Sequence, residues 1–496
     1  MTWALYILPA LPLLAALGTL VGGWRSGSAI TLAGGFATLV LTIAIGIDVE
    51  HGRVLSAAGG WLRIDSLSTV FLLATGLLYA MAAAFSIGYL GVERAREGFT
   101  GFAKRYYALL NLFALSMLLV PLASDFGSLW VVMELTTIVS ALLVAIDRTD
   151  AALEAAWKYV LLASSGLGIA LLAVVILYAT GTHALGGAYI PRFQGLIAHA
   201  HGLSAAAVQL SVVLALVGFG TKVGFVPVHT WLPDAHSEAP APVSAMLSGS
   251  LLAAALYSIL RFFEVAVASG NRAFAEHALI VFGVLSLVAA SFFVLRQSNY
   301  KRLLAYSSIE HMGIVALGIG FGAPLAVAGA LLHVITHASA KGLAFFGAGS
   351  LLRGYDTKEI DGVVDAGRRM PWTGSMVLAA ALALSGLPLS GVFRSEFEIV
   401  VGGFAHAQYV GVAILIVFAN LAFCGIIWNT GRMVLQAAPK SLGAVAGVAA
   451  PRERSVWMVA AMLGCLFVVV ALGMHVPGDL AALLGSARHT LMGTGR

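Results

Sequence analysis

Charged residues are scarce in this sequence. Of its 496 residues, only 10% are Asp, Glu, Lys or Arg, whereas 60% are hydrophobic. A soluble domain carries about 25% charged residues, so the composition excludes a soluble protein. The apolar segments are continuous, which also excludes a membrane β-barrel, because barrel strands are segments of about ten residues with alternating polarity.

Cysteine is nearly absent as well. Cys424 and Cys465 lie in separate apolar runs and form no CxxC pair, so cysteine ligation of an iron–sulfur cluster or zinc within this chain is excluded. The sequence also contains no nucleotide-binding loop and no cofactor motif. We therefore expect no catalytic residue, no cofactor and no metal site in this chain.

Long apolar runs are what the sequence has in abundance. A run of about 20 residues spans a bilayer as a helix, and such runs recur from end to end. The first, residues 4–23, has no charged leader before it and reads as a span and not as a cleavable signal peptide. The sequence predicts an all-α polytopic membrane protein, residues 1–496 forming one transmembrane domain of about 14 helices. The predicted spans are 4–23, 29–47, 66–90, 106–123, 126–146, 159–179, 206–230, 243–263, 277–295, 302–320, 323–352, 373–393, 408–435 and 455–474. The apolar tail 476–487 is too short to cross and is expected in the interface.

The distribution of basic residues predicts the orientation. Of the 28 Lys and Arg residues, 18 fall in loops after odd-numbered spans and 7 on the opposite side; Lys222, Lys341 and Arg394 fall at membrane depth. The positive-inside rule places the richer side in the cytoplasm of a bacterial inner membrane, with both termini outside. The basic excess is thereby explained by topology, and we expect no nucleic-acid partner.

Two segments interrupt the apolar pattern in similar ways: TKVGFVPVHTWLP (221–233) and SGLPLSGVFRSEFEIV (385–400). Each places glycine and proline inside an apolar run beside an ionisable residue, Lys222 or Glu396. Proline removes a helical hydrogen bond, so both helices should be interrupted at membrane depth. Paired interrupted helices predict two inverted five-helix repeats, residues 106–263 (spans 4–8) and 277–435 (spans 9–13), with an ion path between them.

Glu134 lies at the centre of the fifth span, and Lys222 well inside the seventh. Ionisable residues at that depth are costly and generally face a partner or water. A glutamate–lysine pair whose separation changes would alter which group holds the proton, which is the behaviour of a pump. The alternatives are a structural glutamate bonded to a neighbouring helix and a lysine that extends to the interface.

His333, His337 and Lys341 recur at four-residue steps and would form one polar stripe on the eleventh span. We interpret the stripe as part of a proton path; structural histidines packed against neighbouring helices are the alternative. A transition-metal site is disfavoured because the two histidines lack a third ligand.

Further ionisable residues extend this path. Glu310 and His311 begin an acidic entry beside serines in the tenth span. Glu396 and Arg394 close the second interrupted helix, where an interfacial salt bridge is the alternative reading. His229, with Asp234, His236 and Glu238, is expected to form a hydrated mouth and not a metal site.

These stretches resemble one membrane-protein family. The sequence TKVG followed by PVHTWLPDAHSEAPAPVSAMLSG is similar to the antiporter-like proton-pumping subunits of respiratory complex I. That family includes Mrp-type sodium/proton antiporters and membrane subunits of group 4 hydrogenases. MELTTIVSALLVA, YSSIEHMGIVALG and HVITHASAKGLAFFGAG support the resemblance. HSEAP, IEHMG and VFRSEF are nearer in wording to hydrogenase 4 component F of formate-hydrogenlyase-type complexes.

The resemblance implies roles for these residues. Glu134 and Lys222 would form the pair of the first half-channel, His333, His337 and Lys341 the central axis, and Glu396 the terminal proton-exchanging residue. Many relatives carry a base in the eighth span, where this chain has Ala253. The link would then use water and the weaker candidates Ser248, Ser250 and Tyr257.

The resemblance also implies the setting. We expect a proton-translocating subunit in the lipid bilayer, assembled with other membrane subunits and a peripheral cytoplasmic redox module that supplies the energy. The alternatives are a sodium/proton antiporter subunit, or a mainly structural subunit or one serving inorganic-carbon uptake.

Overall fold

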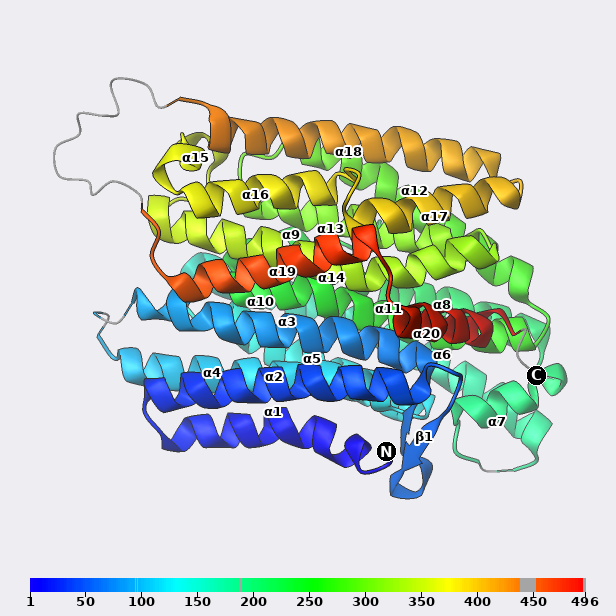
Figure 1. The fold of residues 1–496 in the computed structure, drawn as a ribbon. Helices are drawn as coiled ribbons and strands as arrows, with labels where there is room; N and C mark the ends of the chain where they lie inside the picture. Colours follow the sequence, from blue (N-terminus) through cyan, green and yellow to red (C-terminus); the bar gives the residue numbers. More distant parts are fainter. Residues whose placement is uncertain (94, 96, 188, 438–451, 494–496) are drawn as a thin grey trace.

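The computed structural model describes residues 1–93, 95, 97–187, 189–437 and 452–493. Long helices lie side by side in one bundle, which confirms the all-α membrane architecture (Figure 1). Four of the basic residues counted for orientation, Arg94, Arg96, Lys440 and Arg496, lie outside the described residues.

The first half of the chain begins with two long helices, a short hairpin and the first predicted repeat. Its elements are α1 (Ala4–Val21), α2 (Trp24–Val49), β1 (Leu55–Ala57), η1 (Ala58–Gly60), β2 (Leu62–Ile64), α3 (Ser66–Gly91), α4 (Phe99–Leu122), α5 (Phe126–Val144), α6 (Asp150–Leu185), α7 (Phe193–Ala198), η2 (Ala200–Gly202), α8 (Ala205–Val223), α9 (Leu232–Glu238), α10 (Ala241–Met246), the π-helical turn η3 (Leu247–Leu251) and α11 (Leu252–Ala268). Strands β1 and β2 pair antiparallel, with Ser56 opposite Arg63.

The secondary-structure elements in the described residues of the second half are all helices, joined by loops. Its elements are α12 (Arg272–Leu295), α13 (Tyr300–Gly320), α14 (Pro324–Tyr355), η4 (Ile360–Gly362), α15 (Ala366–Arg369), α16 (Pro371–Leu384), α17 (Gly391–Ala405), α18 (Tyr409–Leu435), α19 (Val456–Met474) and α20 (Gly478–Met492). The predicted repeats correspond to α4–α11 and α12–α18, and the inverted relation between them stays a prediction.

Within the described residues, twelve helical segments are long and apolar enough to cross a membrane. The other two predicted spans, 323–352 and 373–393, correspond to α14 and to α16 with the break after it. The 32-residue α14 carries the His333–His337–Lys341 stripe, and α16 and α17 follow one another along the bundle as two half-helices (Figure 1).

Both predicted interruptions are present, and glycine ends each helix. Helix α8 stops at Val223, where Gly224 adopts φ +85°, and α16 stops at Leu384, two residues before Gly386 at φ +64°. Only glycine takes this left-handed conformation without strain. Pro227 and Pro388 then follow, where they prevent the same helix from resuming.

The chain begins and α20 ends at the same end of the bundle (Figure 1). This agrees with an even number of crossings. The apolar tail forms α20, which packs against α3 and α14. Its side chains Leu483, Leu484 and Ala487 are buried, so protein covers the apolar face of this short helix.

Helices α6 and α8 approach closely at Gly218. A Cβ atom added there would lie 2.4 Å from the Ala170 nitrogen, a distance that real Cβ atoms do not adopt. We expect Gly218→Ala to force α6 and α8 apart and to lower the free energy of unfolding by about 1–3 kcal/mol. Thermal unfolding of the purified protein in detergent measures the change.

Gly168 supplies the matched control, because it lies on α6 with open space around its added Cβ. Gly168→Ala should leave the unfolding temperature unchanged or raise it slightly, since alanine is the better helix former. Equal effects of the two substitutions would contradict the packing interpretation.

Candidate functional site

Lys222 lies in the last turn of α8 and is 0% exposed. Its Nζ atom donates to the Met133 carbonyl at 3.2 Å, to Thr136 Oγ1 at 2.5 Å and to Thr137 Oγ1 at 2.8 Å. An ammonium has three donors, and all three find an oxygen on α5. A threonine hydroxyl can also donate a hydrogen bond, so the same two side chains can bind Lys222 when its amine is neutral.

Glu134 does not contact Lys222. Its Oε1 atom accepts from Ser164 Oγ at 2.7 Å, on α6, and no ion pair within 4 Å joins it to Lys222 among the described residues. The direct glutamate–lysine contact is therefore not formed in this conformation. Both groups are nevertheless linked to α5. Glu134 lies on this helix, and Lys222 of α8 donates to Met133 and Thr136, which lie just before and just after Glu134.

Lys341, on α14, is also 0% exposed and is bound in a similar way. Its Nζ atom donates to the Leu304 carbonyl at 3.0 Å and to Ser307 Oγ at 2.8 Å, both on α13. Each of the two buried lysines thus contacts a carbonyl and a hydroxyl three residues later on the adjacent helix. In the part of the chain that the structure describes, neither has a carboxylate within 4 Å.

The histidines of α13 and α14 meet at the centre of the second repeat. His311 Nδ1 lies 3.1 Å from His333 Nε2, and His333 Nδ1 lies 2.9 Å from Ser395 Oγ on α17. The His337 ring is 5.2 Å from that of His311. All three histidines are buried. His333 and His337 of the predicted stripe are buried beside His311 of α13, and Ser395 of α17 contacts His333. The role of the stripe in a proton path stays a prediction.

Glu396 closes the cluster on the side of α17. Its Oε1 atom lies 3.6 Å from His311 Nδ1, and its side chain is 15% exposed. The alternative pairing with Arg394 is not formed, because Arg394 Nε donates to Glu398 at 3.3 Å. Glu310 is buried and has one carboxylate oxygen without a hydrogen-bond partner among the described residues.

A cavity of about 270 Å³ joins Glu310 and Glu396 to the surface of the bundle. It is lined by Ser385 and Gly386 of the break between α16 and α17, and by Ile416 and Asn420 of α18, which are exposed. Polar groups and this volume suit several waters. Glu396 therefore stands between the buried histidines and an open cavity whose polar lining groups are Glu310, Ser385, Asn420 and Glu396 itself.

Two serine hydroxyls, of Ser248 and Ser308, make a contact between the first and second predicted repeats, near the Ala253 position where many relatives carry a base. Ser248 Oγ, in the π-helical turn η3, lies 2.7 Å from Ser308 Oγ, and Ser308 donates to the Leu304 carbonyl that also accepts from Lys341. The expected hydroxyl link to Lys341 thus starts at Ser248. Ser250 is buried with no partner among the described residues, and Ala253 is buried and apolar.

Tyr257 does not join the serine contacts. It belongs to a buried ionic network around Arg261, which is not among the predictions made from the sequence. Arg261, 2% exposed, donates to Asp65 at 2.8 Å, to Glu264 at 2.6 Å and to the Tyr257 hydroxyl at 3.0 Å. Burial alone would raise the pKa of Asp65, which precedes the span α3, but Arg261 and Arg63 hold this pKa well below its usual range.

Arg261 is one of the seven basic residues assigned to loops on the side of the termini, although the predicted span 243–263 contains it. The loop assignment is wrong, because Arg261 lies within α11 and is buried. Arginine three residues before glutamate within one apolar run, R261-x-x-E264, is the signal that could have identified a buried pair.

The prediction that His229 and His236, after α8, line a hydrated mouth is wrong, because both side chains are buried. His229 packs near the rings of Phe293 and Tyr306, and His236 is fully buried with Nδ1 2.9 Å from the Leu232 carbonyl. The acids of this segment are neutralised by salt bridges: Asp234 pairs with Arg302 at 2.5 Å and Glu238 with Lys358 at 2.8 Å. The segment is a packed, ion-paired connection.

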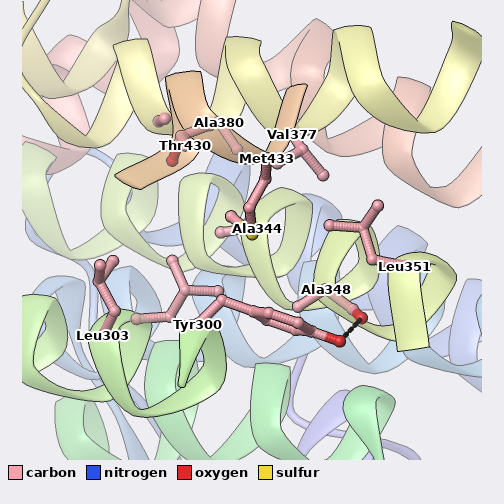
Figure 2. Close-up of a pocket in the computed structure, with 11 residues that line it drawn as sticks. Tyr300, Leu303, Ala344, Ala348, Leu351, Val377, Ala380, Thr430 and Met433 are labelled. Atoms are coloured by element: carbon pink, nitrogen blue, oxygen red, sulfur yellow. Dashed lines mark hydrogen bonds between the residues drawn. The ribbon is translucent and has the colours of Figure 1, made fainter. Parts of the chain in front are cut away.

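A second pocket lies between α13, α14, α16 and α18 and is mostly apolar (Figure 2). Tyr300 is its only titratable lining residue, and its hydroxyl donates to backbone carbonyls at Ala348 and Thr357. This pocket offers no group for proton exchange, in contrast to the cavity at Glu396.

Comparison with known proteins gives a consistent result. The family described as NADH:quinone oxidoreductase/Mrp antiporter, transmembrane, matches residues 123–422. This range contains Lys222, Lys341, the histidine cluster and Glu396.

Two curated relatives match most of the chain. A hydrogenase-4 component F homolog of Methylacidiphilum infernorum is 33% identical over 421 residues, covering 84% of this chain and 86% of the relative. NADH-quinone oxidoreductase subunit N of Moorella thermoacetica is 32% identical over 404 residues, covering 81% of each. Among solved structures, a chain of the Mrp complex of a Dietzia species superposes with a TM-score of 0.86 at 20% identity, covering 100% of this chain and 98% of that chain.

Proposed function

This chain belongs to the NADH:quinone oxidoreductase/Mrp antiporter family, as an antiporter-like membrane subunit, and from that premise we propose that it carries protons across the membrane. It would do so within a multi-subunit oxidoreductase of the hydrogenase 4 or complex I type. The observation that carries the proposal is the set of buried or largely buried ionisable groups that the fold places in the bundle: Lys222, Lys341, His311, His333, His337 and Glu396. Such groups at membrane depth are costly and mark ion paths.

The first step is proton exchange at Lys222. Thr136 and Thr137 contact its amine, and both hydroxyls can donate or accept. Glu134 lies on the same helix and is bound by Ser164. A change in the rotamer of Glu134 or Lys222 would bring the carboxylate to the amine and favour the charged lysine, whereas the present arrangement separates them.

The second step passes to the other repeat through hydroxyl groups. Ser248, Ser308 and the Leu304 carbonyl form a row of contacts that ends at the Lys341 amine. The π-helical turn at Ser248 supports this role, because such turns are frequent at functional sites. A carbonyl accepts but cannot relay a proton, so the transfer would end through Ser307, which contacts Lys341 directly, with water carrying the proton from Ser308 to Ser307.

The last step uses the histidine cluster and Glu396. Imidazole can take a proton on one nitrogen and release one from the other. His333 can relay in this way, because it contacts Ser395 through Nδ1 and His311 through Nε2. His311 faces both His333 and Glu396 with the same nitrogen, Nδ1, so it would accept the proton there and pass it to Glu396 from that atom after a small rotation of its ring. Glu396 then exchanges the proton with water in the cavity that it lines.

The energy for transport must come from partner subunits. Moving one charge against 100 mV costs about 2.3 kcal/mol, and the sequence has no cofactor motif that could supply it. A redox module on the cytoplasmic side, the basic end of the bundle, would drive the change at Glu134 and Lys222.

Glu396→Gln tests the proposal. Glutamine cannot exchange a proton, but the adjacent cavity is large enough for water to replace part of the path, so we expect redox-driven proton movement to fall by about 10-fold. The measurement uses sealed vesicles that carry the intact complex, with a pH-sensitive dye and with and without sodium.

Glu398→Gln is the matched control. Glu398 lies two residues away on α17 and pairs with Arg394, so its loss should leave proton movement near the wild-type level. Unchanged transport in Glu396→Gln would contradict the assigned role. Proton movement that requires sodium would favour the sodium/proton antiporter over the redox-driven proton pump.

A further inference from the structure

Three potential metal ligands converge at the end of the proposed path. The ligand atoms of His311, His333 and Glu396 all lie within 4.8 Å of one another. His311 Nδ1 is 3.1 Å from His333 Nε2 and 3.6 Å from Glu396 Oε1. The three residues come from α13, α14 and α17, so the packing of these helices alone brings them together. Of the two α14 histidines considered from the sequence, only His333 belongs to this group, and its two co-ligands come from other helices.

Two imidazoles and a carboxylate are a typical donor set for zinc. At Zn–ligand distances of about 2.0–2.1 Å, neighbouring ligands of a tetrahedral site lie about 3.3 Å apart. The separations of 3.1 and 3.6 Å bracket this value. Imidazole favours Zn²⁺ and related transition metals, whereas Mg²⁺ and Ca²⁺ favour oxygen ligands.

The surroundings hold the ligands in place. Ser395 Oγ contacts His333 Nδ1 at 2.9 Å, which directs the other ring nitrogen, Nε2, toward the cluster. A hydrogen bond of this kind on the second nitrogen is usual for metal-bound histidine. The cavity of about 270 Å³ reaches Glu396 and gives the ion a route and room for a fourth ligand, such as water.

We infer that His311, His333 and Glu396 bind one Zn²⁺ ion and that the bound ion inhibits the subunit. The metal occupies the His311 and His333 nitrogens that face each other and one Glu396 oxygen, so none of these atoms can pass a proton. Metal binding stands on the geometry alone, whereas inhibition rests on the proposed function.

Zinc binding is measured first, on the full-length protein purified in detergent and stripped of metal with a chelator. Calorimetry should show one tight Zn²⁺ site, and Co²⁺ in the same site should give the visible absorption of a tetrahedral centre. His333→Gln and Glu396→Gln should each weaken binding by at least about 10-fold. His229→Gln is the matched control, because His229 is also buried but packs near Phe293 and Tyr306; its affinity should stay at the wild-type value.

The X-ray absorption spectrum of Zn²⁺ bound to the wild-type protein keeps the test independent of variant folding. Two imidazole ligands and oxygen support the site, and fewer than two imidazoles overturn it. Undiminished affinity in His333→Gln also overturns it.

Inhibition is tested separately in vesicles with the intact complex. Zn²⁺ that blocks proton movement in the wild type, but leaves the residual proton movement of Glu396→Gln unchanged, supports both proposals. Zn²⁺ that binds at the three ligands without slowing proton movement overturns inhibition and removes this cluster from the proposed path, while the metal site stands. Failure of Zn²⁺ to bind overturns the metal site and leaves the proposed transport function as it was.

Discussion

Replacing Lys222 with alanine should reduce redox-driven proton movement by at least about 100-fold, to the level of the background leak, because a positioned proton-transfer group contributes about 10²–10⁴-fold. Lys222 is fully buried, and its amine contacts the hydroxyls of both Thr136 and Thr137. Alanine leaves these hydroxyls without a base. Vesicles that carry the intact complex and a pH-sensitive dye measure the effect.

Lys301→Ala is the matched control for Lys222→Ala. Lys301 is likewise a buried lysine bound by oxygens, the carbonyls of Ser237 at 2.8 Å and Ala239 at 2.6 Å, but it lies outside the proposed path. Its loss should affect stability and leave transport per assembled complex largely intact. If Lys222→Ala retained half of the wild-type proton movement, or if both variants lost transport equally, the role proposed for Lys222 would be wrong.

The second large effect concerns stability. Arg261→Ala should lower the free energy of unfolding by about 3–5 kcal/mol, since removal of one partner from a buried ion pair leaves uncompensated charge. Glu264 would lose its guanidinium partner at 2.6 Å, and Asp65 would lose the closer of its two, at 2.8 Å, and keep Arg63 at 3.3 Å. Thermal unfolding in detergent, followed by circular dichroism, measures the loss.

Arg272→Ala tests whether burial is the cause. Arg272 also pairs with an acid, Glu276 at 2.6 Å, but its side chain is 35% exposed. Exposed pairs contribute about 0–1 kcal/mol, so this variant should be close to the wild type. Combining Arg261→Ala with Glu264→Gln should recover part of the stability, because the second change removes the charge that has lost its ion-pair partner. Absence of any recovery would argue that lost packing, and not charge, explains the effect.

The positions of the helices follow from the sequence. The predicted spans 66–90 and 408–435 match α3 (Ser66–Gly91) and α18 (Tyr409–Leu435) within one residue at each end. The free energy of placing a helix in a bilayer is largely a sum over its own residues, so a local run is sufficient to locate it. The breaks near Gly224 and Gly386 were also readable, because the glycine and proline conformations that end a helix are local.

The partners of the ionisable residues could not be read in the same way. The sequence identified Lys222, but its hydrogen-bond acceptors on α5 depend on how α5 and α8 are rotated against each other. The contact of His311 with His333 also depends on how two helices pack. Arg261, assigned to a loop from its charge, is a buried ion-pair partner of Asp65. His229 and His236 seemed exposed because they follow a broken helix, and side-chain packing buries them.

By itself, the sequence determined the membrane class, the order of the crossings, the two interruptions and the ionisable residues at membrane depth. Each of these depends on the chemistry of a residue and its near neighbours in the chain. Only the tertiary structure decided which groups touch: the threonines at Lys222, the serine link to Lys341, the cluster of His311, His333 and Glu396, and the network of Arg261. Those contacts join residues from different helices, and their distances are set by helix packing, which no local pattern encodes.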